Sequence, residues 1–414
     1  MTKPVAILYA RLKDLCSPTT LATILILVAP LGVAGQNIGI CLALIIFGIL
    51  MARSSGRDLL TALASQTFKQ YAILWGLILI PILAGTIIRG DLKEASRFFW
   101  GNFLVLQLML MSLALRRAKF NSNIILGVVC FVMALLGIVA LTQFSFGWKL
   151  QGVEFLPQIK RAQGFYSHPL TFAYAALVVM PWCIARLMAM PKDPRSWIIA
   201  VSLAIIVLTS QSVTVIVLCF VFATFLGFKL LSKRQLVGAF LLGTFIAIFV
   251  LSVPNPISEK FRTVLSGQRG DHETNYPDDR MAFWHANWEM FKDAPVVGHG
   301  AGLGRSDRQP YYEKIGLGHL KRMYEAHNMF LQYAVEGGCI PPFALLAFLI
   351  WWHLHAHRHG SNQNWKQLAF MLTPLMFALG GLTQNAVQDS EVRFMLLFVC
   401  ALSFWTAKNP EQLQ

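Results

Sequence analysis

Charged residues are scarce in this 414-residue chain: only 13% are Asp, Glu, Lys or Arg, whereas 56% are hydrophobic. The mean hydropathy is +0.56. A soluble domain has too little interior to hide that much apolar surface. The composition therefore excludes a soluble globular protein and predicts a polytopic membrane protein.

Cysteine is absent from the longest polar segment, residues 254–325, where an oxidising compartment would permit disulfides. The seven cysteines lie instead in or beside apolar runs, at Cys16, Cys41, Cys130, Cys183, Cys219, Cys339 and Cys400. We therefore expect no structural disulfide. The sequence also lacks an internal repeat, a low-complexity linker and an evident cleavable signal sequence. We expect one integral-membrane domain, residues 1–414.

Long apolar runs make up most of the chain, and a membrane span needs about 20 such residues. We predict an all-α protein with about twelve spans, near residues 18–34, 36–52, 71–90, 98–115, 123–144, 169–189, 195–209, 212–231, 236–253, 326–352, 367–386 and 392–408. Two of the boundaries are very short: Ala34-Gly35, between the first two spans, and the tight turn at Ser210-Gln211-Ser212. The polar segment 254–325 is expected to be a large loop with short helices.

Positive charge is concentrated in every second segment between spans, although the formal net charge is +15. This alternation is the positive-inside pattern. It places both termini in the cytoplasm and the loop 254–325 on the outside, which is the periplasm in a cell with two membranes. This topology explains the excess of basic residues, which therefore does not indicate a nucleic-acid partner.

The large loop carries an aromatic helix pattern. Arg280, Trp284, Trp288 and Phe291 fall at helical spacing, and Pro295 ends the pattern. One interpretation is an anchoring helix in the membrane interface, with Arg280 reaching toward headgroups. The other is that Arg280, held at the helix start, binds a phosphate through two parallel hydrogen bonds.

A glycine-rich run, residues 298–304, follows this helix and superficially resembles a nucleotide-binding loop. It follows a helix and a proline rather than a strand, and it lacks the P-loop lysine. We expect the glycines to allow close backbone packing against the bundle or a ligand.

The tenth predicted span opens at His327. On a helix, Asn328, Gln332 and Glu336 form a polar stripe, which Gly337-Gly338 and Pro341-Pro342 then break or kink. Polar side chains at membrane depth are costly, so the stripe is expected to line a cavity. His327 is either a structural hydrogen-bonding residue or a general base, since its ordinary pKa of about 6.5 suits proton transfer near neutrality.

A shorter outer loop, before the sixth span, adds Lys160 and Arg161 beside a glycine turn. Together with Arg280, and with Arg262 or Arg269, they would form a cationic pocket for a lipid diphosphate. We interpret two further clusters as solvated surface residues rather than metal ligands. They are the alternating histidines 353–359 and the acids near 271–279. We expect no metal and no cofactor.

These motifs resemble those of the O-antigen ligases of Gram-negative bacteria, in the O-antigen ligase/polymerase superfamily. His327-Asn328-x-x-Leu331, followed by Gly337, is similar to the family's His-Asn-x-x-Leu signature. Arg280-x-x-x-Trp284 resembles its loop motif, and Arg161-x-x-Gly164-Phe165 resembles an earlier arginine-glycine loop. The likeness covers almost the whole chain.

One position departs from the family pattern. Many members have an arginine after the serine where the seventh and eighth spans meet, and this chain has Gln211 there. That arginine's role cannot be carried onto Gln211. Phosphate binding would fall to the other bases.

The resemblance implies a metal-independent, inverting glycosyltransferase of the bacterial inner membrane, with its active site facing the periplasm. It would move a polysaccharide from undecaprenyl diphosphate to a sugar hydroxyl of lipid A–core, with a cavity open to the membrane lipids. The implied catalytic residues are His327 and Arg280. Candidate substrate-binding residues are Lys160, Arg161, Arg262, Trp284, Asn328 and Gln332.

Three alternatives remain open from the sequence. An O-antigen polymerase would add the same donor to another lipid-linked glycan, and a protein oligosaccharyltransferase would use a protein acceptor. A transporter would keep several ionisable residues within its spans, whereas Glu336 is the main one here.

Overall fold

The computed structural model describes residues 16–53, 57–116, 118–148, 161–252, 258, 262, 279–320, 325–358 and 364–406. These residues form sixteen helices: α2 Pro18–Val28, α3 Val33–Arg53, α4 Arg57–Ala64, α5 Gln66–Ile88, α6 Leu92–Ala114, α7 Ser122–Phe146, α8 Pro169–Ala189, α9 Pro194–Ser210, α10 Val213–Leu230, α11 Lys233–Ser252, α13 Asp279–Asp293, α14 Arg305–Lys314, α15 Met329–Gly337, α16 Ile340–Arg358, α17 Trp365–Gly381 and α18 Ser390–Thr406. The predicted all-α class is confirmed.

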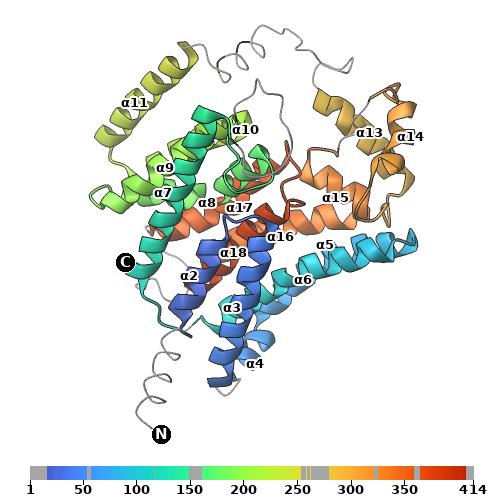
Figure 1. Cartoon of the computed structure of the whole chain (residues 1–414), viewed down its shortest axis with the longest axis horizontal. Coiled ribbons are helices and arrows are strands. Elements are labelled where there is room, and N and C mark those ends of the chain that lie inside the picture. Colours follow the sequence, from blue (N-terminus) through green and yellow to red (C-terminus); the bar gives the residue numbers. More distant parts are fainter. Residues whose placement is uncertain are drawn as a thin grey trace.

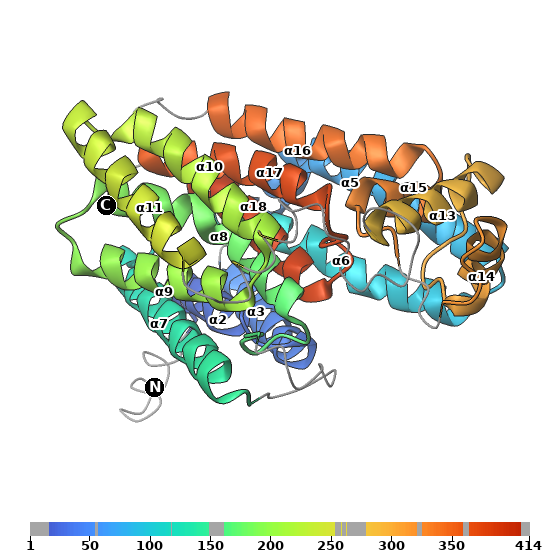
Figure 2. The same ribbon diagram turned by 90° about the horizontal axis from the view of Figure 1, so that it is seen from above.

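Helix α8 forms the centre of the bundle. It packs against α9, α10, α17 and α18, and most of its side chains are buried. A second group joins α5 to α6, α15 and α16. Figure 1 shows these helices as one layered bundle. Figure 2 shows α13 and α14 together at one end of it, beside α15 and over α5 and α6.

Large apolar side chains cover much of the outer surface of this bundle. Ile38, Ile80 and Phe240 are each more than half exposed, for example. Exposed apolar surface of this extent requires lipid rather than water around it. Among the described helices, six are long and apolar enough to cross a membrane by themselves. The chain is therefore a polytopic membrane protein, although fewer than the predicted twelve spans meet that criterion.

The boundary between the first two helices differs from the predicted one. The chain breaks at residues 29–32, and Ala34 and Gly35 lie inside α3. The physical reason is Pro30, which cannot donate a helical hydrogen bond. The predicted turn at Ser210-Gln211-Ser212 is confirmed: Gln211 is the left-handed C-cap of α9, with φ 53°.

The predicted tenth span is divided into two helices. The nine-residue α15 ends at Gly337, and Gly338 has φ 75° before α16 begins. The expected break at Gly337-Gly338 is thereby confirmed. Above α15, helices α13 and α14 pack together through a small apolar cluster around Phe283 and Tyr312. This arrangement brings the start of α13 close to the start of α15.

Candidate functional site

His327 lies in the short connection that leads into α15. The side chain of Asn328 caps the helix by accepting from the backbone N–H groups of Phe330 and Leu331. His327 itself has φ 46°, in the left-handed region that L-residues with bulky side chains rarely adopt. Such strain persists only where the surroundings impose it, and it is found frequently at functional sites.

The imidazole of His327 has a defined hydrogen-bond partner on the loop between α17 and α18. Its Nδ1 lies 3.0 Å from Oε1 of Gln384. Because a carbonyl oxygen can only accept, Nδ1 carries the proton and Nε2 is the basic nitrogen. The ring also packs against Phe283 of α13, with a centroid distance of 5.7 Å.

Burial lowers the pKa of His327 below its ordinary value. The hydrogen bond to Gln384 and the carboxylate of Glu325 oppose this shift, whereas Arg280 and Arg308 add to it. The net direction keeps the imidazole neutral at pH 7. A neutral imidazole with a fixed tautomer can accept a proton on Nε2.

Arg280 lies in the first turn of α13 and is partly buried. Its charge acts on His327 and also on the phenol of Tyr174 in α8. Arg280 therefore lies within electrostatic reach of both His327 and Tyr174. The two sequence-predicted catalytic residues, His327 and Arg280, are therefore electrostatically coupled.

Arg161 approaches from a different element. Its Nε donates to the backbone oxygen of Ser210 at 2.8 Å, and Ala162 N donates to the oxygen of Thr209. The guanidinium is therefore held at the α9–α10 turn, beside Gln211. The cation that the sequence lacks at position 211 is supplied to this turn by Arg161 from another loop.

His168, the N-cap of α8, connects these groups electrostatically. Its Nδ1 accepts from the N–H of Leu170 at 3.0 Å. Burial lowers the pKa of His168 to about 4, and the charges of Arg161 and His327 add to the effect. His327, Arg280, Arg161, His168 and Gln384 are called the His327 cluster below.

The loop between α17 and α18 was missed by the sequence analysis. Besides Gln384, it contributes Asn385, whose Nδ2 donates to Glu325 at 2.8 Å, and Gln388, whose Nε2 donates to Glu336. The available signal was the run of amides and an acid at 384–389 between two apolar spans. No local periodicity connects that run to His327, 57 residues earlier.

The other candidate residues take varied positions. Gln332 is buried and donates to Glu336 at 2.8 Å, so two residues of the polar stripe on α15 are hydrogen-bonded to each other. Trp284 on α13 has a buried Nε1 that finds no acceptor among the described residues. Arg262 is exposed, and Lys160 and Arg269 lie outside the described residues.

The glycine run packs as the sequence predicted, with its backbone against the bundle. His299 N donates to Val335 O and Gly300 N to Glu336 O, both at 2.8 Å. A Cβ added at Gly298 would lie 2.4 Å from backbone atoms of Glu336 and Gly337. These contacts fix the insert onto α15.

Gly298→Ala is therefore expected to destabilise the protein far more than Gly316→Ala. Both positions have positive φ, 70° and 77°, but Gly316 has open space around its Cβ position. The backbone conformation alone costs about 1–2 kcal/mol for alanine, and the clash adds about 1–3 kcal/mol. Thermal unfolding of the purified variants measures the difference, and equal midpoints would contradict the packing described here.

A cavity of about 840 Å³ lies beside the His327 cluster, between α3, α6, α15 and α18. Its lining combines apolar side chains with six charged residues: Glu94, Arg97, Arg308, Glu325, Glu336 and Arg393. Arg308 is buried and donates to Oδ1 of Asn287 at 3.1 Å. Arg308 and Glu325 both line the cavity and act electrostatically on His327.

One part of the chain matches a known protein family. Residues 197–349 match the family model described as O-antigen ligase. The matched segment runs from α9 into α16 and includes Arg280 and His327, whereas Arg161 and Gln384 lie outside it. The predicted resemblance is thereby confirmed over this segment. Among curated proteins, none matches this chain.

Proposed function

We propose, from the O-antigen ligase match over residues 197–349 and the geometry of the His327 cluster, that this chain is an O-antigen ligase. It transfers a preassembled glycan from undecaprenyl diphosphate to a sugar hydroxyl of lipid A–core. The observation that carries this proposal is the contact between His327 Nδ1 and Gln384, which makes Nε2 the proton acceptor.

The reaction follows from the chemistry of the two groups. The acceptor hydroxyl attacks the anomeric carbon of the donor sugar, and its proton passes to Nε2 of His327. The bond from that carbon to the diphosphate breaks, and configuration inverts. The leaving diphosphate carries away negative charge, which Arg280 and Arg161 stabilise in place of a metal.

The position of the two arginines supports this assignment. Both act electrostatically on a histidine of the cluster: Arg280 on His327, and Arg161 on His168. Arg280 comes from helix α13 and Arg161 from the segment before α8, so a diphosphate bound between them would be held at both ends. Lys160 and Arg262 remain candidates for additional contacts with the lipid diphosphate.

The cavity of about 840 Å³ is proposed as the acceptor site. Its arginines suit the phosphates of a lipopolysaccharide core, and its carboxylates and amides suit sugar hydroxyls. Apolar lining residues such as Trp100 and Leu397 suit the lipid portion. Arg308 and Glu325 line the cavity and act electrostatically on His327, which supports an acceptor bound near the base.

The segregation of charge along the bundle supports the proposed orientation. The insert helices α13 and α14 lie at one end of the bundle, where Phe283 of α13 contacts the ring of His327. Arg186, Arg195 and Lys366 lie at the opposite ends of α8, α9 and α17. The positive-inside rule then makes the His327 end periplasmic and the basic end cytoplasmic.

A cellular experiment tests the choice of acceptor. The gene is expressed in a Gram-negative strain that makes the lipid-linked glycan but lacks its own ligase. Long glycan attached to lipid A–core is the expected result. Lengthening of the lipid-linked glycan without modified core would identify a polymerase instead, and glycan on protein would identify an oligosaccharyltransferase.

The pH dependence of transfer is expected to reflect the buried state of His327. The active form of the imidazole is neutral, and burial lowers the pKa of His327. Transfer activity should therefore remain at about pH 6.5, the ordinary pKa of histidine, and be lost only at lower pH. Gln384→Glu places a carboxylate beside Nδ1 and raises the pKa, so the acidic limb should move to higher pH. Gln235→Glu, which adds the same charge at an exposed position, is the control. Coincident profiles for the wild type and Gln384→Glu would contradict the proposed contact.

A further inference from the structure

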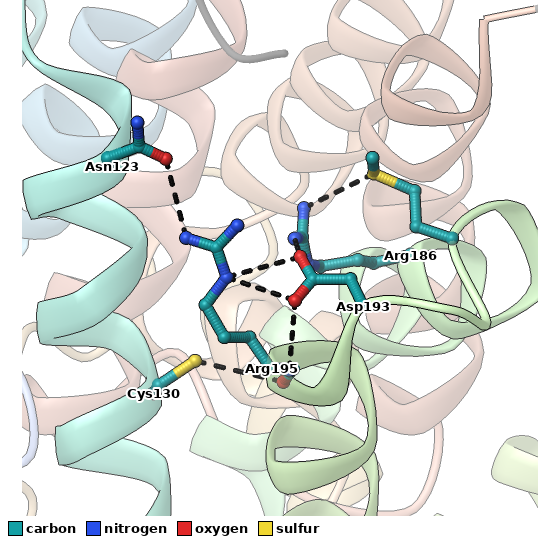
Figure 3. Close-up of polar contacts among 6 residues, drawn as sticks. Asn123, Cys130, Arg186, Asp193 and Arg195 are labelled. Atoms are coloured by element: carbon teal, nitrogen blue, oxygen red, sulfur yellow. Dashed lines mark hydrogen bonds and ion pairs between the residues drawn. The ribbon is translucent and has the colours of Figure 1, made fainter.

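A cluster of cations lies at the end of the bundle opposite the His327 cluster. Arg186 in the last turn of α8 is 3% exposed, and its Nη2 lies 2.5 Å from Oδ2 of Asp193. Arg195 of α9 reaches the other oxygen of the same carboxylate through Nε at 3.0 Å. Figure 3 shows both guanidinium groups directed at Asp193. One carboxylate is thus shared by two arginines.

A third cation, Lys366 at the start of α17, is 8% exposed. Its Nζ lies 5.6 Å from the ring of Trp365, and no acid among the described residues forms an ion pair with it. The same tryptophan and Trp182 each lie 5.9 Å from the guanidinium carbon of Arg186. The Nε of Arg186 is buried and donates to no acceptor in the described part of the chain.

The excess charge is therefore buried and only partly neutralised. Burying a cation without a partner is costly, because the protein interior solvates it poorly. Cation–π contacts with two tryptophans recover part of that cost. An anion with several acceptor oxygens would satisfy Arg186 Nε and Lys366 Nζ together, and a phosphate is such a group.

An apolar groove of about 180 Å³ begins beside this cluster, at Trp182. It runs between α2, α7, α8 and α18, and its described lining includes no charged residue. Lining residues near the cationic end are partly exposed, among them Ile125, Trp182 and Leu402, whereas Pro30 and Tyr166 at the far end are buried. The groove thus has partly exposed lining residues beside the cationic end.

We propose that the groove and the cationic cluster together bind one anionic phospholipid from the leaflet at that end of the bundle. The headgroup phosphate accepts hydrogen bonds from Arg186 Nε and Lys366 Nζ, and an acyl chain lies in the groove. Trp182 lies at the junction, since it contacts Arg186 and lines the groove. This site is separate from the proposed transfer reaction.

Native mass spectrometry of the full-length protein in detergent tests the proposal, with phosphatidylglycerol and phosphatidylcholine as the two probes. One phosphatidylglycerol per protein is expected to survive delipidation or to rebind, with phosphatidylcholine binding at least tenfold more weakly. Lys366→Gln removes a charge-assisted hydrogen bond and should weaken phosphatidylglycerol binding by about tenfold. Lys192→Gln, at an exposed lysine of the same end, should leave it unchanged.

A second variant tests the groove without touching the charges. Ala176 is buried and lines the groove, and Ala176→Leu fills it, so the variant should bind phosphatidylglycerol more weakly while folding normally. Binding of phosphatidylcholine equal to that of phosphatidylglycerol would overturn the proposal. Unchanged phosphatidylglycerol binding in either Lys366→Gln or Ala176→Leu would do so as well.

Discussion

Replacing His327 with alanine is expected to reduce glycan transfer by about 10²–10⁴-fold, the usual contribution of a positioned general base. The loss should appear in the rate at saturating donor, because the imidazole acts on the acceptor proton rather than on donor binding. The measurement is initial transfer rate with purified protein, lipid-linked donor and lipid A–core.

His319→Ala is the matched control for this variant, because His319 is an exposed histidine of the same insert. It should transfer at the wild-type rate. His327→Gln keeps a polar side chain of similar size but no basic nitrogen, so it should be as impaired as alanine. Activity of His327→Gln near the wild-type level would show that His327 positions the acceptor without taking its proton.

Replacing Arg280 with alanine is expected to reduce transfer by about 10²–10³-fold, as removal of one transition-state charge partner does elsewhere. The developing charge on the diphosphate would lose one of its two proposed cations. The transfer rate should therefore fall, and the donor concentration needed for half-maximal rate should rise. Arg280→Lys retains the charge but not the paired donors, and we expect it to recover only part of the activity.

Arg305→Ala provides the comparison, because Arg305 is exposed on the same insert, at the start of α14. Its expected effect on transfer is small. The double variant of Arg280→Ala and Arg161→Ala should lose more transfer activity than either single variant. If both arginines hold one diphosphate, its loss in free energy should differ from the sum of the two single losses. An Arg280→Ala enzyme with normal rate and donor requirement would contradict the proposed role.

The helices of this protein were largely predictable from hydropathy, because lipid imposes long apolar runs on each spanning segment. The broken tenth span was also predictable, since Gly337 and Gly338 interrupt it. The break near Pro30 was misplaced by a few residues. Apolar residues continue on both sides, and the sequence prediction gave too little weight to Pro30, which ends the helix.

The site was predictable only in part. His327, Arg280 and Arg161 carry recognisable local motifs, and the structure brings their charges into one region. Gln384 and His168 were missed, because their roles depend on contacts between segments far apart in the chain. The relation of Arg161 to the α9–α10 turn was likewise invisible, since a backbone oxygen is its partner.

The His327 cluster is proposed to transfer a lipid-linked glycan to lipid A–core without a metal. The most direct test is a detergent reaction of purified protein, undecaprenyl-diphosphate-linked glycan and lipid A–core in EDTA, with wild type and His327→Ala side by side. Glycan is expected on lipid A–core with the wild type, and at most about one-hundredth as much with the variant. Donor left unconsumed by the wild type, or equal transfer by both proteins, would contradict it.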